Sequence, residues 1–124
     1  MTYLKCRQEQ FELQQKWLTL VRKFDVLVMP SGPAVAPRHN ESTIEVGDEY
    51  LPFRDLLGRF TRPFNLLGWP ALSVPNGLTL EGLPTGIQIA GPPDSEANLL
   101  ILGYQIEKGL GLTGKLGIEP CYPK

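Results

Sequence analysis

Histidine, cysteine and serine are all scarce in this chain, and each scarcity restricts the chemistry it can carry. Cys6 and Cys121 stand near opposite ends without Cys-x-x-Cys spacing, so we predict two free thiols and no zinc site or disulfide framework. His39, the only histidine, lies between Arg38 and Asn40 with nothing nearby to orient it. We expect a solvated loop histidine there, and we predict no metal site and no cofactor.

The sequence also lacks a long apolar run and an excess of either charge. Nothing approaches the roughly 18 consecutive apolar residues of a membrane span, and the N-terminus lacks the apolar stretch of a signal peptide. The formal net charge is −1, with both signs mixed along the chain, so no nucleic-acid surface is indicated. We therefore expect a cytoplasmic protein that binds neither nucleic acid nor membrane.

Apolar residues make up 42% of the chain, enough for a core, and 13 glycines and 12 prolines punctuate it. Leu4 to Phe24 has apolar residues at helical spacing, which predicts a helix lying over a sheet with its Gln-rich side in water. The continuous apolar run Val26–Met29 predicts a strand buried on both faces, in a central and mostly parallel position. Pro30 to Asp48 is predicted to be a long loop.

The second half of the chain predicts two further helices and two strands. A helix is expected over residues 50–62, with a break near Arg62 because Pro63 is unfavourable inside a helix. A short turn over Phe64–Leu67 should end at Gly68. The strands are expected at Ala71–Val74 and Thr85–Ala90, and an irregular tail at Leu110–Lys124. Asp94 is the predicted N-cap of the last helix, which should end at Gly109 and bury Ala97, Leu100, Ile101 and Tyr104.

This order of elements places the chain in the α/β class, and three strands with three helices make a poor independent core. The buried strand at Val26–Met29 requires neighbours on both sides, which this chain can hardly supply. Physical reasoning alone thus predicts a fold that is incomplete on its own, with strand edges prone to association.

Two segments carry a resemblance to a known family. They are Thr61–Pro75, reading Thr-Arg-Pro-Phe-Asn-Leu-Leu-Gly-Trp-Pro-Ala-Leu-Ser-Val-Pro, and Gly82–Pro92, which contains Gly-Ile-Gln-Ile-Ala-Gly-Pro. Together they resemble the C-terminal hallmark of the amidase signature family, hydrolases of carbon–nitrogen amide bonds. The resemblance implies that residues 1–124 are the C-terminal segment of an amidase-signature domain with a mixed sheet. It also implies structural roles for its prolines and glycines, and Asn65 and Gln88 are expected to satisfy buried backbone groups.

Amidases of this family use a Ser–Ser–Lys arrangement within a Gly/Ser-rich region upstream of that hallmark, and we expect this chain to begin after it. The four serines are never adjacent, and no lysine matches the family's base. Ser31 follows a strand as a nucleophile would, but its prolines indicate a turn instead of a Gly-x-Ser-x-Gly elbow. Ser73 is expected to be a small residue packed in the sheet. We assign no catalytic residue.

The resemblance does point to substrate-binding residues. Counting back from Pro63, Asp55, Gly58 and Arg62 match the family's pocket-wall positions, and helical spacing would place them on one stripe. An equally acceptable interpretation is that Asp55 and Arg62 merely face water. Gly58 stands where the glutamine-using amidotransferases typically carry Asp, so a general amidase with room for a larger amide substituent fits better.

Two hypotheses follow. In the first, the chain is a C-terminal amidase fragment that contributes sheet and pocket wall, is inactive alone, and acts on a small amide only when a partner chain supplies the catalytic segment. In the second, it is a non-catalytic binding or assembly module derived from an amidase tail, expected to form a homo-oligomer because pairing of copies would cover its open edges. We favour the first as the simpler.

Overall fold

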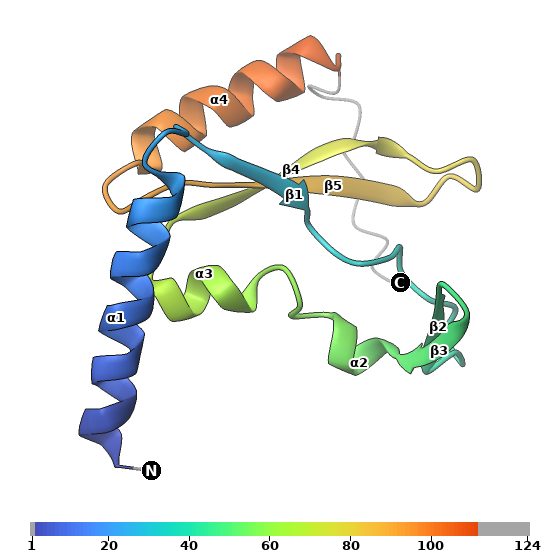
Figure 1. The fold of residues 1–124 in the computed structure, drawn as a ribbon. Coiled ribbons are helices and arrows are strands. Elements are labelled where there is room, and N and C mark those ends of the chain that lie inside the picture. The colour runs from blue at the N-terminus through green and yellow to red at the C-terminus, as the bar shows by residue number, and fades with distance from the viewer. Residues whose placement is uncertain (1, 112–124) are drawn as a thin grey trace, which may run out of the picture.

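The computed structural model describes residues 2–111 and arranges them around a small antiparallel sheet (Figure 1). Cys121 and nearly all of the predicted irregular tail lie outside the described residues. The elements, in chain order, are α1 (Tyr3–Val21), β1 (Leu27–Pro30), β2 (Thr43–Val46), β3 (Glu49–Pro52), α2 (Phe53–Leu56), α3 (Arg62–Leu67), β4 (Ala71–Leu78), β5 (Pro84–Ala90) and α4 (Glu96–Gly109).

The main sheet has the strand order β1-β5-β4, and both pairings are antiparallel. Leu27 lies opposite Ala90 on one side of β5, and Ala71 lies opposite the same residue on the other side. The prediction of a central, mostly parallel position for residues 26–29 is therefore wrong for the described chain. β1 is an edge strand, and Val28 is 59% exposed, because nothing among the described residues pairs with its outer side.

The predicted loop from Pro30 to Asp48 contains a strand, which is a second correction. β2 and β3 form a two-stranded antiparallel hairpin in which Val46 lies opposite Glu49. Gly47 and Asp48 make the two-residue turn between them, and Gly47 has a positive φ of 65°, as the tight turns of such hairpins require. This Gly-Asp pair between two short β-prone runs is the signal that the loop interpretation overlooked.

The predicted helix over residues 50–62 is replaced by β3, the single turn of α2 and a series of turns up to Thr61. A helix boundary does fall at Arg62 as predicted, but a new helix, α3, begins there instead of the predicted one ending. Pro63 lies in its first turn, where the missing N–H would have had no partner within the helix and the fixed φ suits helical geometry.

Two apolar clusters lie on opposite faces of the sheet. One joins α1 and α3 to the sheet through Val21, Phe64, Leu67, Trp69 and Ala90. The other joins α4 to the sheet through Val74, Ile89 and Leu99. Accordingly, Figure 1 shows α4 on one side of the sheet and α3 on the other.

Helix α4 presents a different face to the sheet from the one predicted. Leu99 and Gly103 are its buried residues, whereas Leu100, Ile101 and Tyr104 are between 58% and 63% exposed. The predicted N-cap is also wrong, because Asp94 adopts a positive φ of 69° and Ser95 occupies the N-cap position. Ser95 Oγ donates a hydrogen bond of 2.6 Å to the Pro92 carbonyl within the turn that connects β5 to the helix. None of the helices within residues 2–111 has the length and apolar character needed to cross a membrane.

We predict that Ile89→Ala lowers the free energy of unfolding by about 2–4 kcal/mol, because it leaves a cavity between the sheet and α4. Ile89 is fully buried, at 0% exposure. Urea denaturation followed by circular dichroism measures the change. Leu80→Ala is the matched control, since Leu80 is fully exposed and its truncation should alter stability by less than about 0.5 kcal/mol. Equal effects at the two positions would contradict the described core.

Candidate functional site

Two of the three predicted substrate-binding residues, Gly58 and Arg62, lie against each other. The Arg62 backbone N–H donates to the Gly58 carbonyl at 2.9 Å. A Cβ atom added to Gly58 would collide with Nε of Arg62 and stand 2.9 Å from its Cγ. The side chain of Arg62 therefore occupies the space beside Gly58 that the sequence suggested was available for a substrate group.

These two residues border an open groove of about 510 Å³. Arg59, Pro63, Leu66 and Leu67 continue its wall, and Leu13 and Trp17 of α1 close it from the other side. Among the described lining residues, most are apolar, and two guanidinium groups are the only charges. Asp55 is exposed and does not line the groove, so the structure does not bring it together with Gly58 and Arg62.

The contribution of α1 to this groove was missed from the sequence, although Trp17 was recognised as apolar. Its ring makes edge-on contacts with Phe64 and Trp69, with centroids 6.3 and 6.1 Å away. The Gln-rich side of α1 is not simply in water, as we expected. Gln14 donates a hydrogen bond of 2.8 Å to the Leu67 carbonyl and Gln10 donates to the Leu66 carbonyl, which satisfies the last turn of α3.

Gln88 connects the sheet to the groove-forming segment. This side chain is only 5% exposed, and its Nε2 donates a hydrogen bond of 3.1 Å to the Phe60 carbonyl. The hydrogen bond confirms the expectation that the Gln88 side chain satisfies a backbone group near the site, here the Phe60 carbonyl. Asn65, for which the same role was expected, has an exposed side chain that makes no hydrogen bond to another described residue. Its backbone groups are used instead: the N–H donates to the Thr61 carbonyl and the carbonyl accepts from Gly68 N–H.

Ser31 and Ser73 form a hydroxyl pair on the sheet, with 2.6 Å between their Oγ atoms. Ser73 is exposed, so the expectation of a packed residue is wrong. Gly86 makes room for the pair, because a Cβ there would stand 3.1 Å from Ser31 Oγ and 3.3 Å from the Val74 carbonyl oxygen. Within residues 2–111, no lysine or histidine side chain hydrogen-bonds to either hydroxyl. In this part of the chain, the pair consequently lacks the base that an activated serine nucleophile requires.

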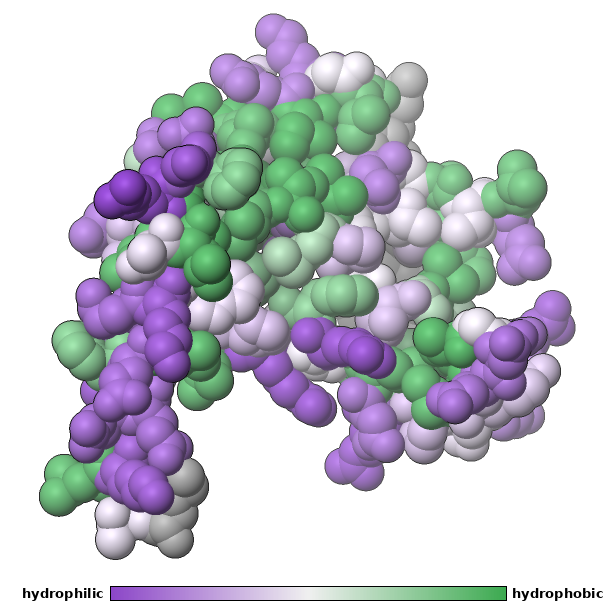
Figure 2. Space-filling model, viewed as in Figure 1, coloured by the Kyte–Doolittle hydropathy of each residue, from purple (hydrophilic) through white to green (hydrophobic). Residues whose placement is uncertain are grey.

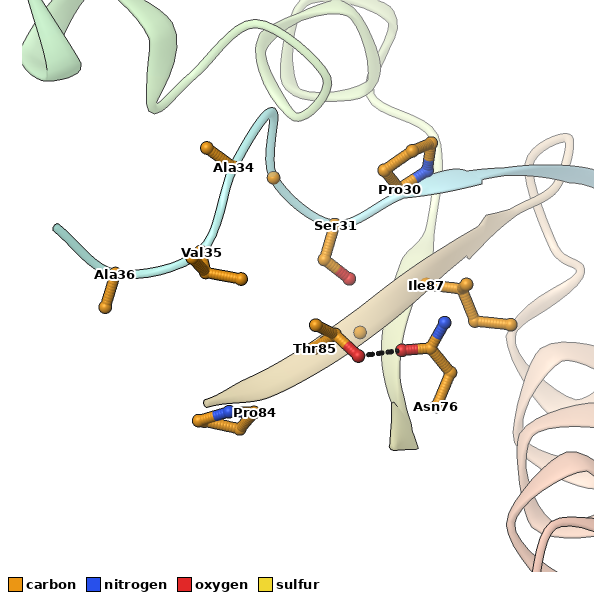
Figure 3. A pocket seen from close by; sticks show the side chains of 11 residues that line it. Pro30, Ser31, Ala34, Val35, Ala36, Asn76, Pro84, Thr85 and Ile87 are labelled. Atoms are coloured by element: carbon orange, nitrogen blue, oxygen red, sulfur yellow. Dashed lines mark hydrogen bonds between the residues drawn. The ribbon is translucent and has the colours of Figure 1, made fainter. Parts of the chain in front are cut away.

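Ser31 also faces a second hollow, of about 540 Å³, between the segment after β1 and the β4–β5 hairpin (Figure 3). Thr85 Oγ1 donates to Asn76 Oδ1 at 2.7 Å across its floor. Ala34, Val35 and Ala36 form one wall. The described residues that line this hollow include no charged side chain and no titratable group that could act as an acid or base.

The part of the chain that the structure describes contains no group of three or more His, Cys, Asp or Glu residues that could hold a metal ion. Cys6 is an exposed free thiol, and His39 is exposed. The predicted absence of a cofactor remains a prediction.

We predict that Gln88→Glu destabilises the fold at neutral pH by about 1–3 kcal/mol, because an ionised carboxylate would face the Phe60 carbonyl without a proton to donate. Burial raises the pKa of the introduced carboxyl above its unfolded value of about 4.3. The loss of stability in the variant is therefore smallest below the unfolded-state pKa of about 4.3. It grows as the pH rises from there through the folded-state pKa. Urea denaturation at a series of pH values measures this, with the exposed Gln15→Glu as the control. A penalty independent of pH would contradict the described hydrogen bond.

Known protein families and curated proteins include clear relatives of this chain. The family model described as Amidase matches residues 1–100. A fatty acid amide hydrolase from Medicago truncatula is 41% identical over 95 residues, which cover 77% of this chain and 16% of that protein. One component of the glutamyl-tRNA(Gln) amidotransferase from Pelagibacter ubique is 32% identical, over 92% of this chain and 22% of that protein. The chain thus spans about a fifth of the length of these curated relatives.

Solved structures contain the same arrangement of elements. One, described as an amidase, superimposes with a TM-score of 0.79 and 30% identity, over 88% of this chain and 25% of its own length. The 6-aminohexanoate cyclic dimer hydrolase superimposes with a TM-score of 0.66 and 27% identity, over 85% of this chain and 23% of its own. The mixed α/β fold therefore corresponds to one part of these larger enzymes.

Proposed function

This chain belongs to the amidase family, and we propose that it is the C-terminal part of a hydrolase that cleaves carbon–nitrogen amide bonds. In this proposal it supplies part of the sheet and one wall of the substrate pocket. The nucleophile and its base come from a Ser–Ser–Lys segment on another polypeptide region, and the described chain is inactive without that segment. This Ser–Ser–Lys arrangement is what the resemblance of Thr61–Pro75 and Gly82–Pro92 to the amidase signature family implies.

One observation carries the proposal: the described elements superimpose on a quarter of an amidase with a TM-score of 0.79. The chemistry of the described residues supports it, because the Ser31–Ser73 pair has no base within hydrogen-bond reach among them. Hydroxyls at their ordinary pKa are weak nucleophiles. Amide hydrolysis by this chain would therefore depend on groups other than these two serines.

The groove beside Gly58 supports a substrate with an apolar portion and a negatively charged or strongly polar end. Its apolar wall comes from α1 and α3, and Arg59 and Arg62 supply positive charge at its rim. Gly58 lacks the carboxylate that would hold the ammonium group of glutamine, so we propose a general amidase specificity. Asp55 remains part of the proposed wall only if the completed enzyme brings it to the groove.

The proposal predicts recovery of activity by complementation. The probe is the Medicago truncatula fatty acid amide hydrolase from which the segment matching this chain has been deleted. We expect neither polypeptide alone to hydrolyse an apolar-chain amide such as oleamide, and the co-expressed pair to do so, measured as ammonia release. A complex that forms without any hydrolysis would instead favour the non-catalytic assembly module.

The source of that activity can be tested with a double variant. Ser31→Ala with Ser73→Ala should leave the co-expressed pair active, because the attacking serine belongs to the other polypeptide, whereas alteration of the probe's own Ser–Ser segment should abolish turnover. Hydrolysis by the purified chain alone that is lost in the double variant would show that these two serines carry the chemistry, contrary to the proposal.

Arg62 offers a second prediction about the completed enzyme. We expect Arg62→Ala to raise KM for an amide substrate bearing a carboxylate about fivefold, since removal of an exposed charge pair costs roughly 1 kcal/mol, with little change in kcat. Arg54→Ala is the control, because Arg54 is exposed on α2 and does not line the groove. An equal effect of both substitutions would indicate general electrostatics and not binding at the groove.

A further inference from the structure

We propose that the outer edge of β1 and the adjoining surface of α4 form a docking surface for the polypeptide region that carries the catalytic segment. This inference rests on the proposed function and identifies where the two parts join. We call this the β1–α4 surface and define it by Phe24, Val26, Val28, Ile101 and Leu102.

The apolar sequence of β1 does not match its position at the edge of the sheet. Val26–Met29 is apolar without alternation, which is typical of a strand covered on both faces, yet β1 is an edge strand with Val28 59% exposed. Val28 lies opposite Ile89, so its side chain shares the face of the sheet that α4 covers. Helix α4 packs mainly on β4, and this leaves the β1 end of that face open.

Helix α4 likewise exposes apolar residues that a covering element would bury. Leu99, Leu102 and Ile106 pack on the sheet, while Leu100, Ile101 and Tyr104 are apolar and mostly exposed on its other sides. Helix α4 therefore carries apolar residues on a second side besides the one that meets the sheet, whereas a surface helix typically has one apolar stripe facing the core. Both β1 and α4 therefore carry apolar side chains that the described residues leave uncovered. Figure 2 shows apolar side chains gathered over this part of the molecule.

A hollow of about 630 Å³ lies between α4 and residues 24–26, the segment that leads into β1. Phe24, Val26, Ile101 and Leu102 supply its apolar lining, and Asp25 is the only charged residue among its described lining residues. Large apolar patches of this kind on a protein surface mark interaction sites. Ser95, Asn98 and Gln105 add neutral polar groups to this lining, so it suits a partner element of low charge that has both apolar and polar side chains.

The free edge of β1 supplies backbone groups as well. Ser31 N–H donates to the Gly86 carbonyl, and hydrogen-bonded pairs alternate along antiparallel strands. In the observed register this alternation directs the N–H and C=O of Val28 to the open side. Pro30 follows on the same side without an N–H, so the edge offers one central donor and favours a short strand addition.

The partner is a continuing amidase polypeptide and not a second copy. The solved amidase contains this arrangement within a chain about four times as large, since the match covers 25% of it. Pairing of two β1 edges would place both prolines against a partner strand and leave each α4 surface only partly covered. A region of the longer enzyme can supply both a strand for β1 and an apolar element for the hollow.

Co-expression with the Medicago probe defined above tests this surface. Val28→Asp should lower recovery of the chain on the tagged probe at least tenfold, because a buried, unpaired charge costs several kcal/mol and about 1.4 kcal/mol is already a factor of ten. Leu80→Asp is the matched control, because Leu80 is fully exposed at the far end of the β4–β5 hairpin, and recovery should change less than about twofold. Equal recovery of the two variants would overturn the proposal.

A second measurement does not depend on how Val28→Asp folds. A photoreactive benzophenone side chain at position 28 should crosslink to the probe, whereas the same group at position 80 should not. Crosslinks at position 28 only between copies of this chain would overturn the proposal in favour of a homodimer. Crosslinking with no amide hydrolysis would support the docking surface and count against the proposed function. Amide hydrolysis that is unaffected by Val28→Asp would support the proposed function and count against the docking surface.

Discussion

The pairing of β5 with a strand on each side is the interaction on which the rest of the structure depends. Residues 27–30 and 71–78 meet only through this strand, and its alternating side chains serve both cores. Ile89 contacts the α4 cluster, whereas Ala90 belongs to the α1–α3 cluster and Gln88 reaches the Phe60 carbonyl. A one-residue slip of β5 would exchange these roles and bury the polar side chain on the apolar side.

The two faces of the sheet are completed to different extents. On one face, α1 and α3 are fixed to each other by aromatic contacts and by glutamine side chains that bond the last carbonyls of α3. On the other face, α4 covers β4 and β5 but leaves Val28 exposed. The chain belongs to the amidase family and covers a quarter or less of the length of the solved relatives. Under the proposed function, the rest of such an enzyme would cover the open end of this face.

Local signals in the sequence were enough to predict most elements but not their partners. The helical spacing over residues 4–24 and the helix boundary near Arg62 were predicted because periodicity and proline geometry act locally. The edge position of β1 and the buried face of α4 were predicted wrongly because both elements are apolar on more than one side, so periodicity cannot say which side meets the sheet. At the candidate site, the contact between Gly58 and Arg62 follows from four-residue spacing. The share of the groove that α1 supplies depends on a tertiary contact between residues 17 and 64.

The closeness of Gly86 to the two serine hydroxyls has a consequence for how these positions can vary. A Cβ atom at residue 86 would stand 3.1 Å from Ser31 Oγ, 3.3 Å from the Val74 carbonyl oxygen and 3.4 Å from Ser73 Oγ, so part of the cost of Gly86→Ala depends on the side chains at positions 31 and 73. Where both serines are replaced by smaller side chains, the same methyl group would meet less resistance. Substitutions at these three positions are therefore energetically coupled, and the order in which they arise decides which intermediates remain folded.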